Sequence, residues 1–190
     1  MISTKRICLL LVFSFLLQIR VSAQPDSSNR TLKVIIIRHG EKPFKGDNLT
    51  CQGLNRSMQL PAVLNAKFGI PQLVYVPSLG NGESTKHARM FETVAPFAAK
   101  YNLTINSSYA GKDFDGITKN LNSKKGNILI VWDHKAIPGL AKALGVTESN
   151  LSWDDNDYDS IWIIEFTAGS ATPVFKKDTE GLSPAVACPF

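Results

Sequence analysis

Five residues of this sequence could carry out chemistry on phosphate, because each carries a charged or titratable side chain and each follows an apolar run, either directly or, for Arg89, through a loop. They are Arg38, His39, Arg89, Asp133 and His134. Arginine stays charged, and its planar fork of donors matches the oxygens of a phosphoryl group. Histidine titrates near neutral pH, so it can attack as a nucleophile or donate a proton. A pocket that joins these side chains predicts phosphoryl transfer through a phosphohistidine.

The elements that must position these residues are four short apolar runs, which alternate with helical patterns as in an α/β fold. We expect strands at VIII (34–37), LVYV (73–76), ILIVW (128–132) and IWIIEF (161–166). The first and third runs are continuous, which is typical of central strands covered on both faces. The patterns between them predict helices over 51–67, 84–100, 112–123 and 136–144. The fold class that follows is a three-layer α/β/α sandwich with a mainly parallel central sheet.

The predicted helix over 51–67 has clear end signals, with Thr50 as a capping residue and Gly69 as a stop. We expect its apolar face to be formed by Leu54, Met58, Ala62 and Ala66. Pro96, inside the next helix, predicts a kink or a break there. Residues 146–160 are acidic and rich in turn-forming residues, so we expect a surface loop before the last strand.

The carboxyl ends of parallel strands meet at one edge of a sheet, where ligands bind in open α/β folds. The two arginines and two of the histidines would then converge on one rim. Gly40 would let the backbone and a phosphate approach each other closely. Two structural interpretations stay open. Arg89 could pair with Glu92 or Glu83 on a solvated helix face, and His134 could be a core histidine at a strand end.

Four segments follow one another along the chain: VIIIRHGEKP, LTCQGLNRSMQL, STKHARMFETVAPFA and ILIVWDHKAIPGLAKALG. They resemble, in order and spacing, the motifs of the histidine phosphatase superfamily, also called phosphoglycerate mutase-like, over about residues 32–166. The match is closest to a small secreted or bacterial subgroup with an RHGEKP start. The resemblance implies a phosphoglycerate mutase-like fold in which His39 is the nucleophile that becomes phosphorylated. Arg38 and Arg89 would bind phosphate, and His134 would be the second histidine of the pocket.

The resemblance also implies a proton donor for the leaving oxygen, and no glutamate follows Arg89 in a matching context. Asp133, immediately before His134, is the first candidate, and the others are Asp113, Asp115 and Glu83. Adjacent side chains on a regular strand point to opposite faces, so Asp133 could instead orient a neighbouring group.

Residues 1–23 have the pattern of a secretory signal peptide, with a basic pair, an apolar run and small residues that end at Ala23. The apolar run is shorter than the roughly 20 residues that a membrane span needs. We therefore expect a cleaved signal, a flexible lead-in over 24–31 and a single domain over 32–190. The mature protein would be secreted or periplasmic.

Loss of the predicted signal would lower the formal net charge from +5 to +2, because it removes three cations and no acid. No basic run with interleaved aromatic residues remains, so the composition does not support a nucleic-acid partner. Two cysteines, Cys51 and Cys188, would remain. They could form one disulfide or stay as two buried thiols.

The predicted function is a phosphomonoester hydrolase that acts through a phosphohistidine on an exported small-molecule or peptide phosphate ester. It would need no cofactor and no metal, because the arginines supply the positive charge. A non-catalytic phosphate- or anion-binding protein on the same scaffold is the main alternative. A mutase is a second alternative, and the third is a zinc site built from His39, His87, His134 and an aspartate.

Overall fold

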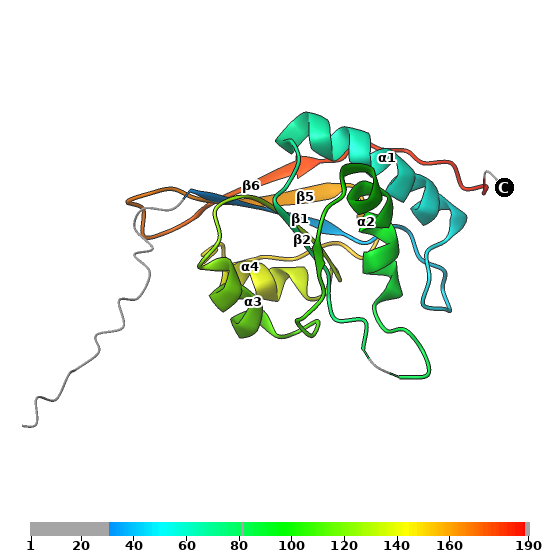
Figure 1. Cartoon of the computed structure of the whole chain (residues 1–190), viewed down its shortest axis with the longest axis horizontal. Helices are drawn as coiled ribbons and strands as arrows, with labels where there is room; N and C mark the ends of the chain where they lie inside the picture. Colours follow the sequence, from blue (N-terminus) through cyan, green and yellow to red (C-terminus); the bar gives the residue numbers. More distant parts are fainter. Residues whose placement is uncertain (1–30, 81, 189–190) are drawn as a thin grey trace, which may run out of the picture.

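A sheet of six strands forms the centre of residues 31–80 and 82–188, the part of the chain that this computed structural model describes (Figure 1). The strands are β1 Leu32–Arg38, β2 Leu73–Tyr75, β3 Ile105–Asn106, β4 Gly126–Trp132, β5 Ser160–Phe166 and β6 Val174–Thr179. Their order in space is β3-β2-β4-β1-β5-β6. The pairs β3-β2, β2-β4 and β4-β1 are parallel, so the expectation of a mainly parallel sheet is confirmed.

Four helices of the described residues cover the two faces of this sheet: α1 Cys51–Phe68, α2 Ala88–Tyr101, α3 Phe114–Leu121 and α4 Ile137–Ala143. The first two pack on one face and the last two on the other (Figure 1). The predicted three-layer sandwich is therefore confirmed.

The alternation of side chains along β1 explains why its sequence is an unbroken aliphatic run. Val34 and Ile36 pack with the core on the α3 and α4 side, whereas Ile35 and Ile37 pack with the core on the α1 and α2 side. Because side chains alternate between the faces of a strand, a strand buried on both faces has no polar positions. All four residues are at most 2% exposed.

The edge of the sheet differs from the sequence prediction. The strand predicted over 161–166 exists as β5, but it runs antiparallel to β1, and β6 runs antiparallel to β5. Neither β3 nor β6 was predicted. The first is two residues long, and the second is an edge strand with mostly exposed side chains, so neither carries an apolar run.

The ends of α1 are as predicted, but its buried face is not. The Thr50 side chain accepts a hydrogen bond from the Gly53 amide, and the Gly69 amide donates to the Asn65 carbonyl. Met58, expected in the buried face, is 64% exposed. The buried positions are instead Gly53, Arg56, Ser57, Leu60, Pro61 and Leu64. The prediction failed because it followed strict steps of four residues, which drift around a helix, and because it excluded a charged residue from the buried side.

The helix predicted over 84–100 begins later and does not break. His87 has φ 56°, in the left-handed region, so a regular helix starts only at Ala88. The helix is continuous through Pro96 as far as Tyr101.

A buried arginine joins three segments that lie far apart in the sequence. Arg56 on α1 is 4% exposed, and its Nε and Nη2 atoms donate to the carboxylate of Glu41 in the loop after β1. Its Nη1 atom donates to the fully buried carboxylate of Glu180, just after β6, and lies 3.5 Å from Asp159. Burial opposes this charge, but the hydrogen bonds and charges of the two glutamates raise the pKa of Arg56 above its ordinary value. Arg56 therefore fastens the loop after β1 to the C-terminal segment.

Of the two interpretations of the cysteines, the structure contains the disulfide. Cys51, the first residue of α1, is bonded to Cys188, 137 residues later. Asn55 on the same helix donates to the carbonyl oxygens of Ala185 and Ala187. A cross-link over so long a span stabilises a fold mainly by restricting the unfolded chain.

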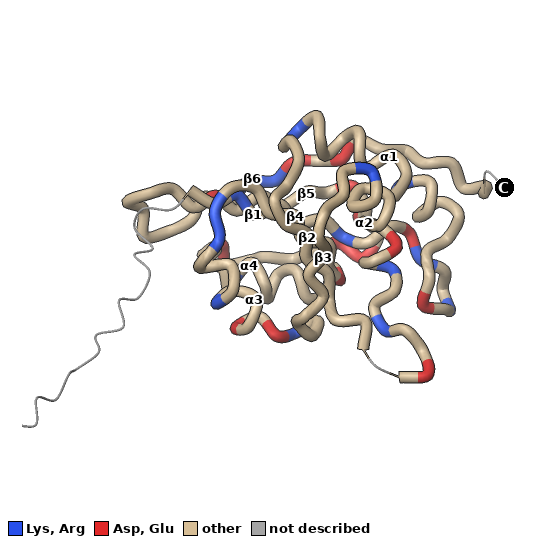
Figure 2. Tube along the Cα trace, viewed as in Figure 1, with Lys and Arg blue, Asp and Glu red and all other residues tan. Residues whose placement is uncertain are grey.

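The predicted signal peptide, and all of the predicted lead-in except Thr31, lie outside the described residues. Among the helices of the described chain, none combines the length and the apolar character that a membrane crossing requires. Acidic and basic residues are interspersed over the described chain (Figure 2).

Replacement of Arg56 by Ala should lower the free energy of unfolding by about 3–5 kcal/mol, because the buried Glu180 and the half-buried Glu41 would lose their cation. Lys67→Ala is the matched control on the same helix, since Lys67 pairs with Asp178 at 2.9 Å and both side chains are about one-third exposed. That pair should contribute at most about 1 kcal/mol. Urea denaturation with the disulfide intact measures both values. Equal losses for the two variants would contradict the structural role assigned to Arg56.

Candidate active site

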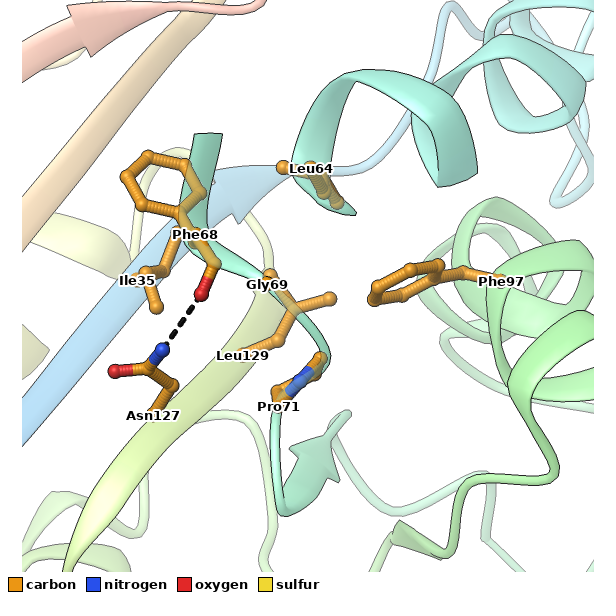
Figure 3. Close-up of a pocket in the computed structure, with 8 residues that line it drawn as sticks. All are labelled: Ile35, Leu64, Phe68, Gly69, Pro71, Phe97, Asn127 and Leu129. Carbon is orange, nitrogen blue, oxygen red and sulfur yellow. Dashed lines mark hydrogen bonds between the residues drawn. The ribbon is translucent and has the colours of Figure 1, made fainter. Parts of the chain in front are cut away.

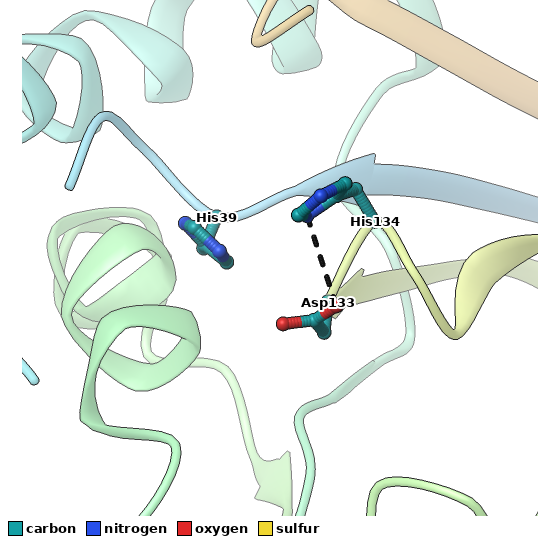
Figure 4. Close-up of side chains that lie close together, drawn as sticks. All are labelled: His39, Asp133 and His134. Atoms are coloured by element: carbon teal, nitrogen blue, oxygen red, sulfur yellow. Dashed lines mark ion pairs between the residues drawn. The ribbon is translucent and has the colours of Figure 1, made fainter. Parts of the chain in front are cut away.

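The ends of β1 and β4 lie side by side, and each is followed by a histidine. Arg38 pairs in register with Trp132, and the His39 amide donates to the Trp132 carbonyl at 3.2 Å. The segments that follow β1 and β4 leave the sheet side by side, and the ring centroids of His39 and His134 are 6.4 Å apart. Figure 4 shows both rings beside Asp133, and potential ligand atoms of the three residues lie within 4.8 Å of one another.

One ring nitrogen of His39 is buried and has no partner among the described residues. Its Nδ1 atom lies 2.7 Å from the Gly40 carbonyl oxygen, and because a carbonyl only accepts, Nδ1 carries the hydrogen. The Nε2 atom is buried and has no hydrogen-bond partner among the described residues. Burial, together with the charges of Arg38 and Arg89, lowers the pKa of His39 to about 4. The ring is therefore neutral at neutral pH, with its lone pair on Nε2.

Gly40 has a packing role, and its expected role in the close approach of a phosphate stays a prediction. A Cβ atom at this position would lie 2.9 Å from the carbonyl oxygen of Gly53 on α1. A Cβ atom at Gly53 would in turn lie 2.4 Å from the carbonyl oxygen of Glu41. The two glycines let the loop after β1 press against the start of α1. The Gly40 amide is used as well, because it donates to the Thr93 hydroxyl at 2.8 Å.

Arg38 is held by a loop that sequence reasoning placed on the surface. Its side chain is buried, and Nη1 donates to the carbonyl oxygens of Asp154, Asp155 and Asp157 at 3.3, 2.8 and 3.0 Å. The guanidinium carbon lies 3.8 Å from the centre of the Tyr158 ring. Its Nε atom is buried without a partner among the described residues. The loop therefore fixes one edge of the guanidinium and leaves Nε for a ligand.

Arg89 lies on the first turn of α2 and makes no ion pair within the described chain. Its Nη1 atom donates to the Gly46 carbonyl at 3.3 Å, and its Nε atom is buried without a partner there. The alternative pairing with Glu92 does not occur, since that carboxylate accepts from the Leu49 amide at 2.9 Å. Its charge contributes to the lowered pKa of His39, so the guanidinium is electrostatically coupled to the cluster.

His134 belongs to this cluster rather than to the apolar core. It is 4% exposed, and its Nε2 atom lies 2.7 Å from a carboxylate oxygen of Asp155. Its Nδ1 atom has no hydrogen-bond partner in the described part of the chain. The nearest acidic group to Nδ1 is Asp133, at 3.7 Å, which is too long for a hydrogen bond.

The unpartnered atoms are the strongest sign of a binding site. In the described residues, five buried side-chain polar atoms lack a partner: Arg38 Nε, His39 Nε2, Arg89 Nε, His134 Nδ1 and Glu180 Oε1. The first four belong to residues that the sequence singled out for phosphate chemistry. Native proteins pair nearly all buried polar groups with protein or water, so these unpaired donors and lone pairs are the atoms that a bound ligand would complete. A phosphoryl group offers acceptor oxygens for the arginines and an electrophilic phosphorus for His39.

Only one of the four candidate proton donors lies in the cluster. Asp133 accepts from the Lys135 amide at 2.8 Å, and its carboxylate stands near both histidines. Asp113 instead caps α3, because it accepts from the Gly116 amide at 3.0 Å. Asp115 and Glu83 are exposed, and neither is part of the cluster.

Sequence reasoning missed Asp155 and Tyr158, which contact the site from the acidic loop. The loop has no periodicity from which such contacts follow. Trp153 was the one available signal, since an aromatic residue in an acidic loop suggests a packed segment. It is buried, and its ring packs 5.1 Å from that of Trp162 between centroids, while its indole donates to the Asp157 carbonyl.

Two of the hollows in the surface of the described residues differ in chemistry. One, of about 280 Å³, adjoins the cluster and is lined by charged and aromatic residues that include Arg38, Lys42, Phe44, His134 and Tyr158. The other is a shallow apolar hollow near the opposite end of β1 (Figure 3). Its one polar side chain, Asn127, donates to the Phe68 carbonyl. No titratable side chain lines this hollow, so it is not a candidate catalytic site.

Several solved structures have the same fold. A protein histidine phosphatase SixA complexed with tungstate is 16% identical, with a TM-score of 0.52 over 78% of this chain and 97% of that one. A mycobacterial glucosyl-3-phosphoglycerate phosphatase with inorganic phosphate is 10% identical, with a TM-score of 0.52 over 77% and 95%. A phosphoglycerate mutase from Plasmodium falciparum is 12% identical, with a TM-score of 0.50 over 85% and 99%.

No protein-family model matches this chain, and no curated protein matches it significantly in sequence. At these identities the structural likeness establishes the fold, which is phosphoglycerate mutase-like, as expected.

The His39 ring should titrate near pH 4, well below the ordinary value of about 6.5. Histidine NMR across pH measures this midpoint, and single substitutions assign the signals because the chain has three histidines. Arg89→Met should raise the midpoint, since it removes a cation, but should leave it below the ordinary value because burial is the larger cause. A midpoint near 6.5 in the wild-type protein would contradict the strong effect of burial on this ring.

Proposed function

We propose that this protein is a phosphomonoester hydrolase that works through a phosphohistidine at His39. The observation that carries the proposal is the set of four unpartnered buried atoms, which match the needs of a phosphoryl group and its attacker. Two of the structural neighbours are phosphatases, and their structures hold tungstate and inorganic phosphate, both tetrahedral oxyanions. The likeness supports the proposal through the shared fold.

In the first step, the phosphoryl oxygens of the substrate take hydrogen bonds from the Nε atoms of Arg38 and Arg89. The lone pair of His39 Nε2 attacks phosphorus in line with the ester oxygen. The P–N bond forms, the P–O ester bond breaks, and the leaving oxygen keeps the electron pair and takes a proton from the Asp133 carboxyl group. Positioning and charge neutralisation supply most of the catalysis in such a transfer.

In the second step, water attacks the phosphorus of phospho-His39 and gives a proton to the Asp133 carboxylate. The P–N bond breaks, inorganic phosphate is formed, and the lone pair returns to His39 Nε2. His134 acts in both steps through Nδ1, which takes the proton of a singly protonated phosphoryl group and donates a hydrogen bond back to it. The cycle is balanced without an outside reactant other than water.

The alternative of a zinc site is less well supported by the geometry. His39, Asp133 and His134 could supply ligand atoms, but the guanidinium groups of Arg38 and Arg89 act on the same cluster and would repel a cation. His87, the other histidine considered for such a site, is outside the cluster, and its Nδ1 atom lies 2.8 Å from the Ser78 carbonyl.

The proposed substrate is a phosphate ester outside the cytoplasm. Residues 1–23 have the pattern of a secretory signal peptide. The Cys51–Cys188 disulfide is in keeping with an oxidising compartment. A small-molecule or peptide ester would meet the enzyme there after export.

His39→Gln should lower turnover of p-nitrophenyl phosphate by about a thousandfold or more, because the variant has no nucleophile. Binding of inorganic phosphate, measured by calorimetry, should persist because both arginines remain. His87→Asn is the control, since Asn tolerates the left-handed backbone at this position and His87 lies outside the cluster. If wild-type protein binds phosphate but hydrolyses no ester at any pH, the protein is the non-catalytic binder instead.

Asp133→Asn should separate substrates by their leaving groups, since a proton donor matters most for a poor one. Hydrolysis of glycerol phosphate, whose leaving alkoxide is strongly basic, should fall by about 10²–10⁴-fold. The first step with p-nitrophenyl phosphate, measured as the phosphoenzyme burst, should fall much less. Equal losses for both esters would show that Asp133 orients a neighbour and does not donate the proton.

A further inference from the structure

We propose that Asp155 is a positioning residue, which fixes the ring of His134 so that Nδ1 faces the phosphate pocket. This inference rests on the proposed function for its catalytic meaning, although the geometry alone carries its structural part. The residue comes from the acidic loop, residues 144–159, which separates α4 from β5.

The contact between His134 and Asp155 is a short hydrogen bond in which the histidine is the donor. A carboxylate oxygen of Asp155 lies 2.7 Å from His134 Nε2, the shortest polar contact recorded for that ring. The hydrogen bond from His134 lowers the pKa of Asp155, and the charges of Lys135 and Arg38 contribute, so the carboxylate stays ionised and only accepts. His134 Nε2 must therefore carry the hydrogen, which leaves Nδ1 as the atom on the pocket side.

Asp155 is exposed, yet its backbone is not free. Its side chain is 76% exposed, whereas its carbonyl oxygen accepts from the buried Arg38 at 2.8 Å. Arg38 binds the carbonyls on either side of it as well, and Trp153 packs into the core below the loop. The acidic loop is thus anchored by the same arginine that would bind phosphate, so the position of Asp155 is tied to the pocket.

An exposed carboxylate beside a histidine is often only a surface ion pair of small energy. Two features distinguish this one. Its partner His134 is almost completely buried, and the other ring nitrogen of that partner is one of the four unpartnered atoms of the site. Without Asp155 the ring could carry its hydrogen on either nitrogen or rotate, and the pocket would lose a defined group at that point.

The test compares Asp155→Ala and Asp155→Asn with Glu148→Ala, which removes an exposed carboxylate from the same loop. In wild-type protein, ¹⁵N NMR of the histidine ring should show the hydrogen of neutral His134 on Nε2. The Ala variant should lose this preference, whereas the Asn variant should keep it because its amide oxygen still accepts. The Glu148 variant should match the wild type.

The same variants are then compared in activity and in phosphate binding. For Asp155→Ala we expect kcat on p-nitrophenyl phosphate to fall roughly 10- to 100-fold, as for other groups that orient a functional histidine, with a smaller change in KM. Asp155→Asn should recover most of the loss. Inorganic phosphate should bind the Ala variant more weakly than wild type in calorimetry, since His134 contributes to the same pocket.

The inference is overturned if the Ala variant keeps the Nε2 hydrogen and binds phosphate as tightly as the wild type, even where the protein is an active phosphatase. If the wild type hydrolyses no ester but the tautomer and phosphate affinity change as expected, the proposed function fails and the role of Asp155 in holding His134 stands.

Discussion

The parallel pairing of β1 with β4 is the constraint on which the whole site depends. Their register places Arg38 opposite Trp132, so the residues that follow, His39 on one strand and Asp133 with His134 on the other, leave the sheet together. Both strands are aliphatic on both faces, so burial alone does not choose this register. The ends of the strands help to choose it. The Gly126 amide donates to the Thr31 carbonyl at one end, and the His39 amide donates to the Trp132 carbonyl at the other. A slip of one residue would turn each polar side chain to the opposite face.

Two buried arginines show how the same residue type serves structure in one place and a ligand in another. Arg56 is surrounded by the carboxylates of Glu41 and Glu180, which neutralise its charge and use its donors. Arg38 is instead held by carbonyl oxygens and the face of Tyr158, which carry no net charge. Carbonyl dipoles and an aromatic ring can stabilise a buried guanidinium without cancelling its positive field. The charge of Arg38 therefore remains available to an anion, whereas that of Arg56 does not.

The sequence predicted the parts of this arrangement that depend on local patterns, and it did not predict those that depend on contacts between distant residues. The sheet centre, α1 with its Thr50 cap, and the meeting of Arg38, His39 and His134 all follow from local apolar runs and from the geometry of parallel strands. The buried face of α1 could not be predicted, because the burial of Arg56 depends on Glu180, more than a hundred residues away. The acidic loop was taken as surface for the same reason: its carbonyls bind Arg38, and no pattern in the sequence encodes that contact.

The two histidines have different neighbours, and this difference suits them to the different roles that we propose for them in one pocket. His39 donates from Nδ1 to the Gly40 carbonyl, a backbone group that cannot titrate, so the fold itself fixes Nε2, the atom that we propose as the nucleophile. Burial and two nearby guanidinium groups then disfavour a proton on that lone pair. His134 donates from Nε2 to Asp155, a side chain that is largely in solvent. The nitrogen that we propose as the nucleophile is thus a buried atom of a neutral ring. The ring to which we assign the phosphoryl proton is thus held by a carboxylate at the solvent boundary. Enzymes often give two groups of the same type different roles by placing them in surroundings that shift their pKa values apart.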